Sequence, residues 1–216
     1  MPLFYQQNIN ESTRLAIWHI TENEAFFQEN AIVQRAITHP HKRLQHLAGR
    51  YLLKFLFPDF PNEELRVADT RKPFLPGEQY HFSISHCGDF AAVIVSKNKR
   101  VGIDIEQFSS RVENIRHKFL HPEEMKMIDQ ASGQHVNLLT TFWCSKEAMF
   151  KWWAFGEIDF SEALRIETLP QQKEGSMQAF FVKEDFEIPL CLNYNLFEKI
   201  ALVWLATEPD VFKVVD

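Results

Sequence analysis

The spacing of hydrophobic and polar positions changes along the chain and separates helical from strand-like segments. Residues 40–57 carry apolar side chains at three- and four-residue steps, which is typical of a helix with one buried face. In the middle of the chain, short segments rich in β-branched or aromatic residues alternate with turn-forming residues. They predict consecutive antiparallel strands at 81–86, 90–96 and 101–106. Helical spacing returns near residue 111, at 121–124 and over 135–154, and four strand-like segments follow, at 163–168, 178–183, 190–195 and 200–206.

The first residues predict strands followed by a helix. Alternation up to about residue 20 indicates one or two strands, and Thr21 and Glu24 have the spacing of a capping box before an apolar stretch. Strands and helices are therefore grouped along the chain rather than strictly alternating. This order favours an α+β fold over a doubly wound parallel sheet.

Composition narrows the class of protein. The chain has 216 residues, 45% of them hydrophobic and 24% charged, as in a globular protein of one large or two small domains. The formal net charge of −6 argues against general nucleic-acid binding. No apolar run approaches the ~20 residues of a membrane span, and the first residues lack the features of a secretory signal. The three cysteines are far apart and in no Cys-x-x-Cys pair, so we expect free thiols in a cytoplasmic protein. From the net charge and the short apolar runs we expect neither nucleic-acid nor membrane partners.

Two carboxylates stand two residues apart in the segment Val101-Gly102-Ile103-Asp104-Ile105-Glu106. On a strand, Asp104 and Glu106 share one face, while Ile103 and Ile105 point to the other. Adjacent carboxylates repel each other, and magnesium is a common remedy because it takes one or two carboxylates together with waters and phosphates. The alternative is a solvated strand face with incidental acids.

A second group of polar residues lies in the predicted helix 135–154. Trp143, Glu147 and Lys151 are four residues apart and share one helix face. Glu147 could be a third metal ligand or a general base, and Lys151 could hold a phosphate. The alternative is a surface ion pair between Glu147 and Lys151.

Basic residues gather in the first part of the chain. No Asp or Glu stands between Asn30 and Pro58, and this stretch holds several basic side chains and histidines: Arg35, His39, His41, Lys42, Arg43, His46, Arg50 and Lys54. Such an island in a net acidic protein suits an anionic ligand, although a solvated helix face is the alternative. Ser85, His86 and Cys87 are not expected to form a nucleophile pair, since adjacent strand residues point in opposite directions.

Four segments in this order resemble the 4'-phosphopantetheinyl transferases of the larger, surfactin-synthetase-activating type. The segments are Arg71-Lys72-Pro73, Phe82-Ser83-Ile84-Ser85-His86, Val101-Gly102-Ile103-Asp104-Ile105-Glu106 and the helix from Trp143 to Lys151. The resemblance implies two similar α/β halves, a pseudo-dimer, each an antiparallel sheet packed with helices. Residues 1–99 would form the basic, coenzyme A-binding half, and residues 100–216 would carry the magnesium carboxylates.

The resemblance also assigns roles to residues. Asp104, Glu106 and Glu147 would bind magnesium, with Asp104 close to the coenzyme A pyrophosphate and Glu147 as the base in this family's chemistry. The remaining assignments concern the coenzyme. Lys151, Ser85 and His86 would contact its phosphates, and Lys72 and Pro73 would lie near its adenosine. Lys42 and Arg43 would belong to the family's basic helix region on the coenzyme-binding side.

Three departures from the family pattern are visible. Arg71 replaces the glycine of the Gly-Lys-Pro turn, and Ser83 replaces an asparagine. After Lys151 the chain has Trp152-Trp153-Ala154-Phe155-Gly156 where some members have a basic loop. We expect these aromatics either to pack in the core or to contact a carrier protein.

The predicted function is transfer of 4'-phosphopantetheine from coenzyme A to a serine of an apo acyl or peptidyl carrier protein. Magnesium is the predicted cofactor, adenosine 3',5'-bisphosphate the second product, and a monomer the predicted state. Two alternatives stay open. One is a magnesium-dependent phosphohydrolase acting on a pyrophosphate-containing nucleotide, and the other is a non-catalytic relative that binds carrier proteins.

Overall fold

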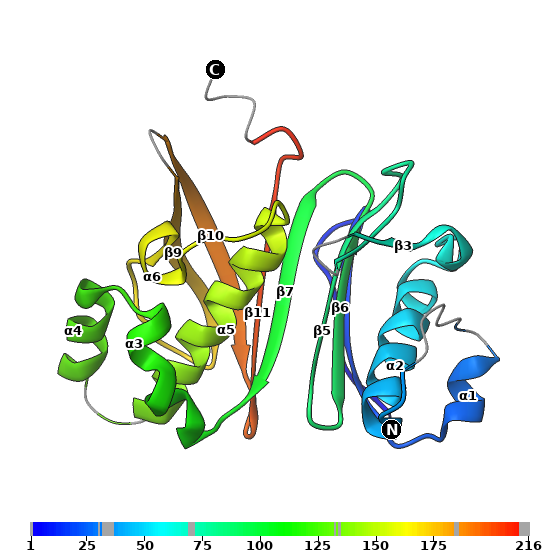
Figure 1. Ribbon diagram of the computed structural model, residues 1–216, viewed down its shortest axis with the longest axis horizontal. Helices are drawn as coiled ribbons and strands as arrows, with labels where there is room; N and C mark the ends of the chain where they lie inside the picture. Colours follow the sequence, from blue (N-terminus) through cyan, green and yellow to red (C-terminus); the bar gives the residue numbers. More distant parts are fainter. Residues whose placement is uncertain are drawn as a thin grey trace. The chain divides into compact units, whose positions relative to one another are not determined.

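The computed structural model describes residues 2–29, 31, 37–68, 72–131, 133, 135–183 and 186–211. The chain divides into two compact units, Met1–Val101 and Gly102–Asp216. Each unit has its own sheet and its own hydrophobic core (Figure 1). The grouped strands, antiparallel pairings and packed helices confirm the α+β class that the order of elements predicts.

The first unit is built on a four-stranded antiparallel sheet. Its hydrogen-bonded order is β1-β2-β6-β5, with bounds β1 Leu3–Asn8, β2 Thr13–His19, β5 His81–Cys87 and β6 Phe90–Ser96. The turn between β5 and β6 contains Gly88, whose φ of 49° lies in the left-handed region that glycine adopts without strain. This turn confirms the break that the sequence predicts between the two strands.

Helix α2 (Pro40–Leu56) packs against β6 and confirms the predicted helix. It begins at Pro40 because proline suits the first turn, and the His39 ring accepts a hydrogen bond from the Lys42 backbone N–H. Leu52 and Leu53 on its apolar face are fully buried. The other elements of this unit are short: α1 Glu24–Gln28, η1 Asn62–Glu64, β3 Arg66–Val67 and β4 Pro73–Phe74.

The second unit contains a five-stranded sheet. Its order is β7-β11-β10-β9-β8, with bounds β7 Arg100–Gln107, β8 Leu164–Ile166, β9 Glu174–Lys183, β10 Phe186–Leu196 and β11 Ile200–Thr207. The four strands β8 to β11 pair antiparallel with their neighbours. All four match strand-like segments that the sequence predicts near the end of the chain.

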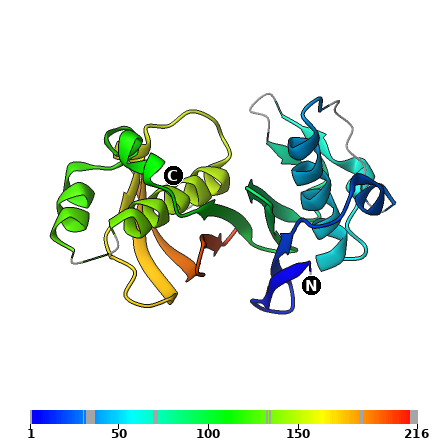
Figure 2. The same cartoon turned by 90° about the horizontal axis from the view of Figure 1, so that it is seen from below.

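Helix α5 (His135–Trp153) lies against one face of this sheet, beside β7 and β11 (Figures 1 and 2). Its core-facing residues include Trp152, with no exposed surface, and Trp153, at 7%. These two tryptophans are therefore core residues and not docking contacts, while Phe155 stays 65% exposed. The other helices are η2 Ser110–Ile115, α3 Arg116–Phe119, α4 Pro122–Gln130 and α6 Phe160–Ala163.

Two details of the sequence prediction are wrong. β7 does not continue the β5-β6 hairpin, because it pairs with β11 in the sheet of the second unit. Periodicity identifies a strand but not its partner, and a short polar connection fits either a hairpin or a crossing to another sheet. The N-cap of α1 is Asn23 rather than Thr21, since the Asn23 side chain accepts a hydrogen bond from the Phe26 N–H at 3.2 Å.

Candidate active site

The two carboxylates of β7 are withdrawn from water. Asp104 is 2% exposed, Glu106 is half-buried, and Ile103 and Ile105 on the opposite strand face are fully buried. The strand therefore places both acids on one face, as its alternation predicts. The alternative of a solvated strand face is wrong.

Gly102 allows helix α5 to approach this strand closely. A Cβ atom at Gly102 would stand 2.2 Å from the Ala148 carbonyl oxygen and 2.8 Å from the Trp152 Cβ. No other residue type fits against the helix backbone at this point. The glycine thus brings the Glu147 and Lys151 turns of α5 next to the carboxylates.

Two side chains of α5 bind the two acids of β7. The Lys151 ammonium donates to Asp104 Oδ1 at 2.5 Å, and Trp143 Nε1 donates to Glu106 Oε1 at 3.1 Å. The earlier helix residue binds the later strand residue, so helix and strand run in opposite directions across the site. Lys151 is paired with the buried Asp104, and the alternative of a surface ion pair with Glu147 is wrong.

The electrostatics of the cluster are strongly perturbed. Burial, followed by the charge of Asp104, raises the pKa of Glu147 to about 7. The same two causes raise the pKa of Glu106 to about 7, with a further contribution from Glu147. Burial is the largest single effect on Lys151 and lowers its pKa, but the charge and hydrogen bond of Asp104, together with Glu147 and Cys144, outweigh it and the net shift is upward. Three acids thus share the neighbourhood of one lysine, an excess of negative charge that a bound cation would relieve.

The chemistry of these donors fits a magnesium ion. Carboxylate oxygens are the hard ligands that Mg²⁺ prefers, and the mutual repulsion of Asp104, Glu106 and Glu147 favours a divalent cation. Within the described ranges of the chain, no three His, Cys, Asp or Glu side chains stand in an arrangement that would already hold a metal. Magnesium often takes only one or two carboxylates and completes its shell with waters and phosphates, so this donor set remains suitable.

Lys72 and Pro73 lie in the first unit, at the start of the short strand β4. Burial, and secondarily the charge of Arg100, lowers the pKa of Lys72 to about 8. Burial also lowers the pKa of Arg100 to about 10. Sequence reasoning missed Arg100, the first residue of β7, whose only signal was its place directly before the predicted strand 101–106. Arg71 lies outside the described residues.

Ser85 and His86 are neighbours near the end of β5. Ser85 is buried, and the His86 ring lies 5.4 Å from the ring of His46 on α2. The structure therefore joins β5 to the basic helix at a pair of histidines. The sequence includes His46 in the basic island without pairing it with His86.

Lys42 and Arg43 have different surroundings on α2. Lys42 is exposed, whereas the Arg43 Nη2 stands 2.6 Å from Glu24 Oε1 and its Nη1 donates to the Ile37 carbonyl at 2.7 Å. Arg43 therefore ties α2 to α1 and to the segment before α2. Arg35 of the basic island lies outside the described residues.

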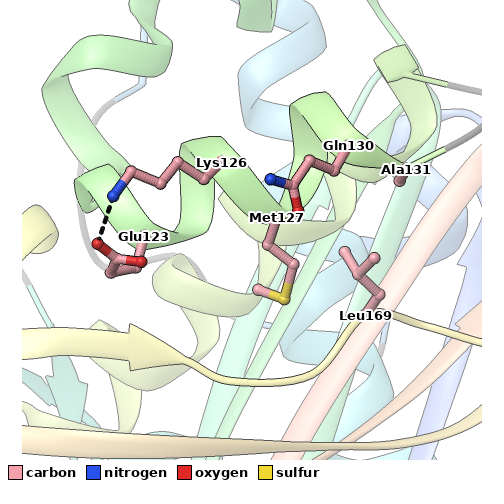
Figure 3. A pocket seen from close by; sticks show the side chains of 6 residues that line it. All are labelled: Glu123, Lys126, Met127, Gln130, Ala131 and Leu169. Carbon is pink, nitrogen blue, oxygen red and sulfur yellow. Dashed lines mark hydrogen bonds and ion pairs between the residues drawn. The ribbon is translucent and has the colours of Figure 1, made fainter.

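Two surface grooves lined by described residues lie away from these groups. An open groove of about 410 Å³ beside α4 is shown in Figure 3 and is lined by Glu123, Lys126, Met127, Gln130, Ala131 and Leu169. Another in the first unit is lined by Asp59, Pro61, Glu64, Gln79, Tyr80 and Lys97. Neither contains a residue that the sequence assigns to the site. The candidate site is the buried carboxylate cluster of β7 and α5, which neither of these two grooves reaches.

The segment that holds this cluster is also the segment that is similar to known proteins. Residues 100–202 match the 4'-phosphopantetheinyl transferase superfamily. The matched range contains β7 and α5, and with them Asp104, Glu106, Glu147 and Lys151. The superfamily is the one that the sequence motifs predict, and the surfactin-synthetase-activating subtype stays a prediction.

Individual relatives agree with the superfamily match. Enterobactin synthase component D of Escherichia coli (strain K12) is 29% identical over 113 residues, 51% of this chain and 54% of that protein. The 4'-phosphopantetheinyl transferase gsp of Aneurinibacillus migulanus is 32% identical over 108 residues, 49% and 44% of the two chains. The 4'-phosphopantetheinyl transferase AcpT of Salmonella typhimurium is 32% identical over 115 residues, 51% and 58%. The chain spans about half the length of the curated relatives it matches.

Helix lengths add one finding. In the part of the chain that the structure describes, no helix is both long enough and apolar enough to cross a membrane.

Proposed function

We propose that the protein transfers 4'-phosphopantetheine from coenzyme A to a serine of an apo acyl or peptidyl carrier protein. The observation that carries the proposal is the cluster of Asp104, Glu106, Glu147 and Lys151, held between β7 and α5 inside the matched range 100–202. We further propose the larger, surfactin-synthetase-activating type, a pseudo-dimer of two similar halves that works as a cytoplasmic monomer. The four sequence motifs support that subtype.

In the proposed reaction the serine hydroxyl of the carrier attacks the β-phosphate of coenzyme A. A new P–O bond forms to the serine oxygen, the bond from the β-phosphorus to the bridging oxygen breaks, and adenosine 3',5'-bisphosphate leaves. Glu147 accepts the serine proton, directly or through a water. Its pKa of about 7 suits a general base, because a pKa near the working pH leaves a substantial ionised fraction that can still take a proton.

Asp104, Glu106 and Glu147 would hold the magnesium ion of this reaction. When bound, the ion would offset the negative charge of the pyrophosphate, which is most of what phosphoryl-type transfer needs from a protein. Lys151 would add a second positive charge near the phosphates. Its present partner Asp104 keeps the ammonium oriented in the site.

The first unit would supply contacts to the nucleotide. Lys72 and Pro73 would lie near the adenosine, Ser85 and His86 near its phosphate end, and Lys42 would add positive charge from α2. Arg43 is the weakest member of this set because Glu24 already neutralises it. The half-buried Lys72 supports this assignment, since burial and the charge of Arg100 make its ammonium costly to charge, a cost that a bound phosphate would offset.

The test is to incubate the protein with coenzyme A, magnesium and a panel of apo carrier proteins, and to weigh the carriers. The proposal expects at least one carrier to gain a single phosphopantetheine, and the same carrier with its acceptor serine changed to alanine to gain none. Breakdown of coenzyme A at the same rate with and without carrier would indicate a phosphohydrolase. Carrier binding without a mass change or coenzyme breakdown would indicate a non-catalytic relative. Either result would overturn the proposal.

A further inference from the structure

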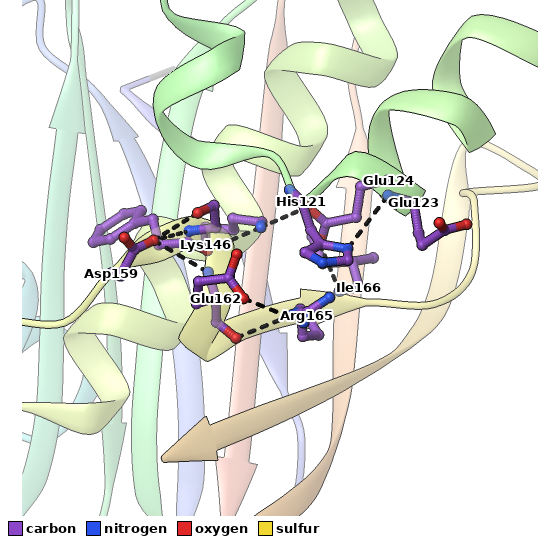
Figure 4. A network of polar contacts seen from close by, with 10 residues as sticks. His121, Glu123, Glu124, Lys146, Asp159, Glu162, Arg165 and Ile166 are labelled. Carbon is purple, nitrogen blue, oxygen red and sulfur yellow. Dashed lines mark hydrogen bonds and ion pairs between the residues drawn. The ribbon is translucent and has the colours of Figure 1, made fainter. Parts of the chain in front are cut away.

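A buried ion pair lies on the side of α5 away from β7. The Lys146 ammonium, with no exposed surface, stands 2.6 Å from Glu124 Oε2, and the Glu124 side chain is only 3% exposed. Figure 4 shows the pair at the centre of a network of polar contacts. Lys146 is the residue directly before Glu147, and nothing in the proposed reaction uses it.

The pair connects α5 to three other elements. Lys146 also donates to the Phe160 carbonyl at 3.0 Å, at the start of α6. Glu124 Oε1 accepts from the Ile166 N–H of β8 at 2.8 Å, and Glu124 Oε2 accepts from the His121 N–H at the start of α4, also at 2.8 Å. Both charged groups are therefore bound by several partners, which is the condition for keeping charges in a protein interior.

Stability alone does not account for this arrangement. Well-packed apolar residues of similar volume are often as stabilising as a buried ion pair, or more so, because both charges must be taken out of water. The core around α5 is rich in apolar side chains, among them Phe142, Met149 and Leu164, and could accommodate such a replacement. Unlike apolar packing, a hydrogen-bonded ion pair constrains the relative orientation of the two elements that carry it, because its hydrogen bonds form only when donor and acceptor are aligned.

The position of Lys146 makes that direction relevant to the site. Successive helix residues are turned by about 100°, so the orientation of Lys146 about the α5 axis sets that of Glu147. On the side of β7, Gly102 sets how closely the helix approaches, and the hydrogen bonds from Lys151 to Asp104 and from Trp143 to Glu106 hold that face of the helix. The Lys146–Glu124 pair holds the helix from the opposite side.

We propose that Lys146 and Glu124 are positioning residues that fix the rotation of α5 and thereby aim Glu147 at the reacting groups. The inference rests on the proposed transferase function. A misplacement of about 1 Å can cost on the order of 100-fold in rate, so a small rotation is enough to matter. The pair touches neither substrate nor metal in this account.

The test compares Lys146→Met with the double variant Lys146→Met/Glu124→Gln. The single variant leaves a buried carboxylate without its cation, so we expect a clear fall in the melting temperature. The double variant removes both charges, and the amide oxygen of the introduced glutamine can still accept from one backbone N–H, so most of the melting temperature should return. We expect the kcat of the double variant to stay about 10- to 100-fold below that of wild type, with the KM for coenzyme A within about twofold of the wild-type value.

The matched control is Lys126→Met/Glu123→Gln, which removes the exposed ion pair next to Glu124 on α4. It should change neither melting temperature nor kcat. Hydrogen exchange gives a readout independent of activity: in the double variant, amides of residues 146–153 should lose protection while those of β9 and β10 keep it.

The outcomes are distinct. A double variant with recovered melting temperature, wild-type kcat and unchanged exchange would show that the pair only balances charge, and the proposal would be overturned. A double variant that does not fold would place the role of the pair in the fold itself and would overturn it equally. If wild-type protein loads no carrier, the proposed function fails, and the exchange measurement still decides whether the pair orients α5.

Discussion

At the scale of single residues, Glu147 has two candidate roles that leave different traces. A metal ligand changes the magnesium requirement when it is removed, whereas a base changes turnover. Its position beside Asp104, and its pKa of about 7 from burial and from that neighbour, suit both roles. We expect both, with the larger effect on turnover.

The Glu147→Gln variant separates these roles because glutamine keeps the shape and one oxygen ligand. We expect turnover to fall by about 10²–10⁴-fold at saturating magnesium, with coenzyme A binding by calorimetry nearly unchanged. Glu157→Gln, on the segment after α5, is the control and should behave as wild type. Transfer at the wild-type rate by Glu147→Gln would leave the residue at most a ligand.

The residue scale also shows what the sequence could and could not predict. Strand alternation predicted that Asp104 and Glu106 share one face of a strand. Helical spacing predicted that Trp143, Glu147 and Lys151 share one face of a helix. Neither pattern could predict that Lys151 binds Asp104 or that Trp143 binds Glu106, because those contacts depend on how the helix crosses the strand. The distances between the three carboxylates also could not be predicted from a sequence pattern, because they depend on the same packing of helix and strand.

At the scale of elements, the packing of α5 on β7 depends on Gly102. We expect Gly102→Ala to destabilise the protein by about 1–3 kcal/mol, the usual cost of overpacking, because the new methyl group meets a backbone carbonyl that cannot move alone. Activity should fall further than stability alone explains, since α5 carries Glu147 and Lys151. Chemical denaturation and a transfer assay measure the two effects.

Gly77→Ala is the matched control for this substitution. The nearest atoms to a Cβ at Gly77 belong to the amide end of the exposed Gln79 side chain, at 2.9–3.1 Å, which can swing away. Its effect should be within about 0.5 kcal/mol, as for most surface substitutions. Equal stability losses for the two alanine variants would contradict the close-approach role of Gly102.

The elements themselves were largely predictable, because strong periodicity reports burial of one face. α2, α5 and the strands β9 to β11 lie where the hydrophobic pattern predicts them. The short hairpin of β3 and β4 was not predicted, since two-residue strands have no period to detect. The pairing of β7 with β11 was missed because the partners are about 100 residues apart and pairing is decided by the tertiary fold.

At the scale of the whole molecule, the raised pKa values of Glu106 and Glu147 link stability to pH. Both groups hold protons more tightly in the folded chain than in the unfolded one, so their contribution is complete below about pH 4.5 and is lost as the pH rises through about 7. Magnesium competes with those protons. It should therefore raise the melting temperature more at about pH 8 than at about pH 5.

Thermal denaturation at these two pH values, with and without magnesium, measures this linkage. In the Glu106→Gln/Glu147→Gln double variant the difference between the two pH values should shrink, and magnesium should have little effect at either. A magnesium effect that is the same at both pH values in wild type would argue that the ion binds elsewhere.

The most direct measurement of the central claim is carrier loading by Asp104→Asn beside Asp129→Asn. Asp104 is buried in the cluster and bound by Lys151, whereas Asp129 is half-exposed and paired with Arg116 on the surface of the same unit. With coenzyme A, magnesium and a carrier that wild type modifies, Asp129→Asn should load the carrier at the wild-type rate. Asp104→Asn should fold, as its melting curve will show, yet load it at least about 100-fold more slowly. Equal loading by the two folded variants would contradict the account, because the carboxylate cluster between β7 and α5 would then not be where the chemistry occurs.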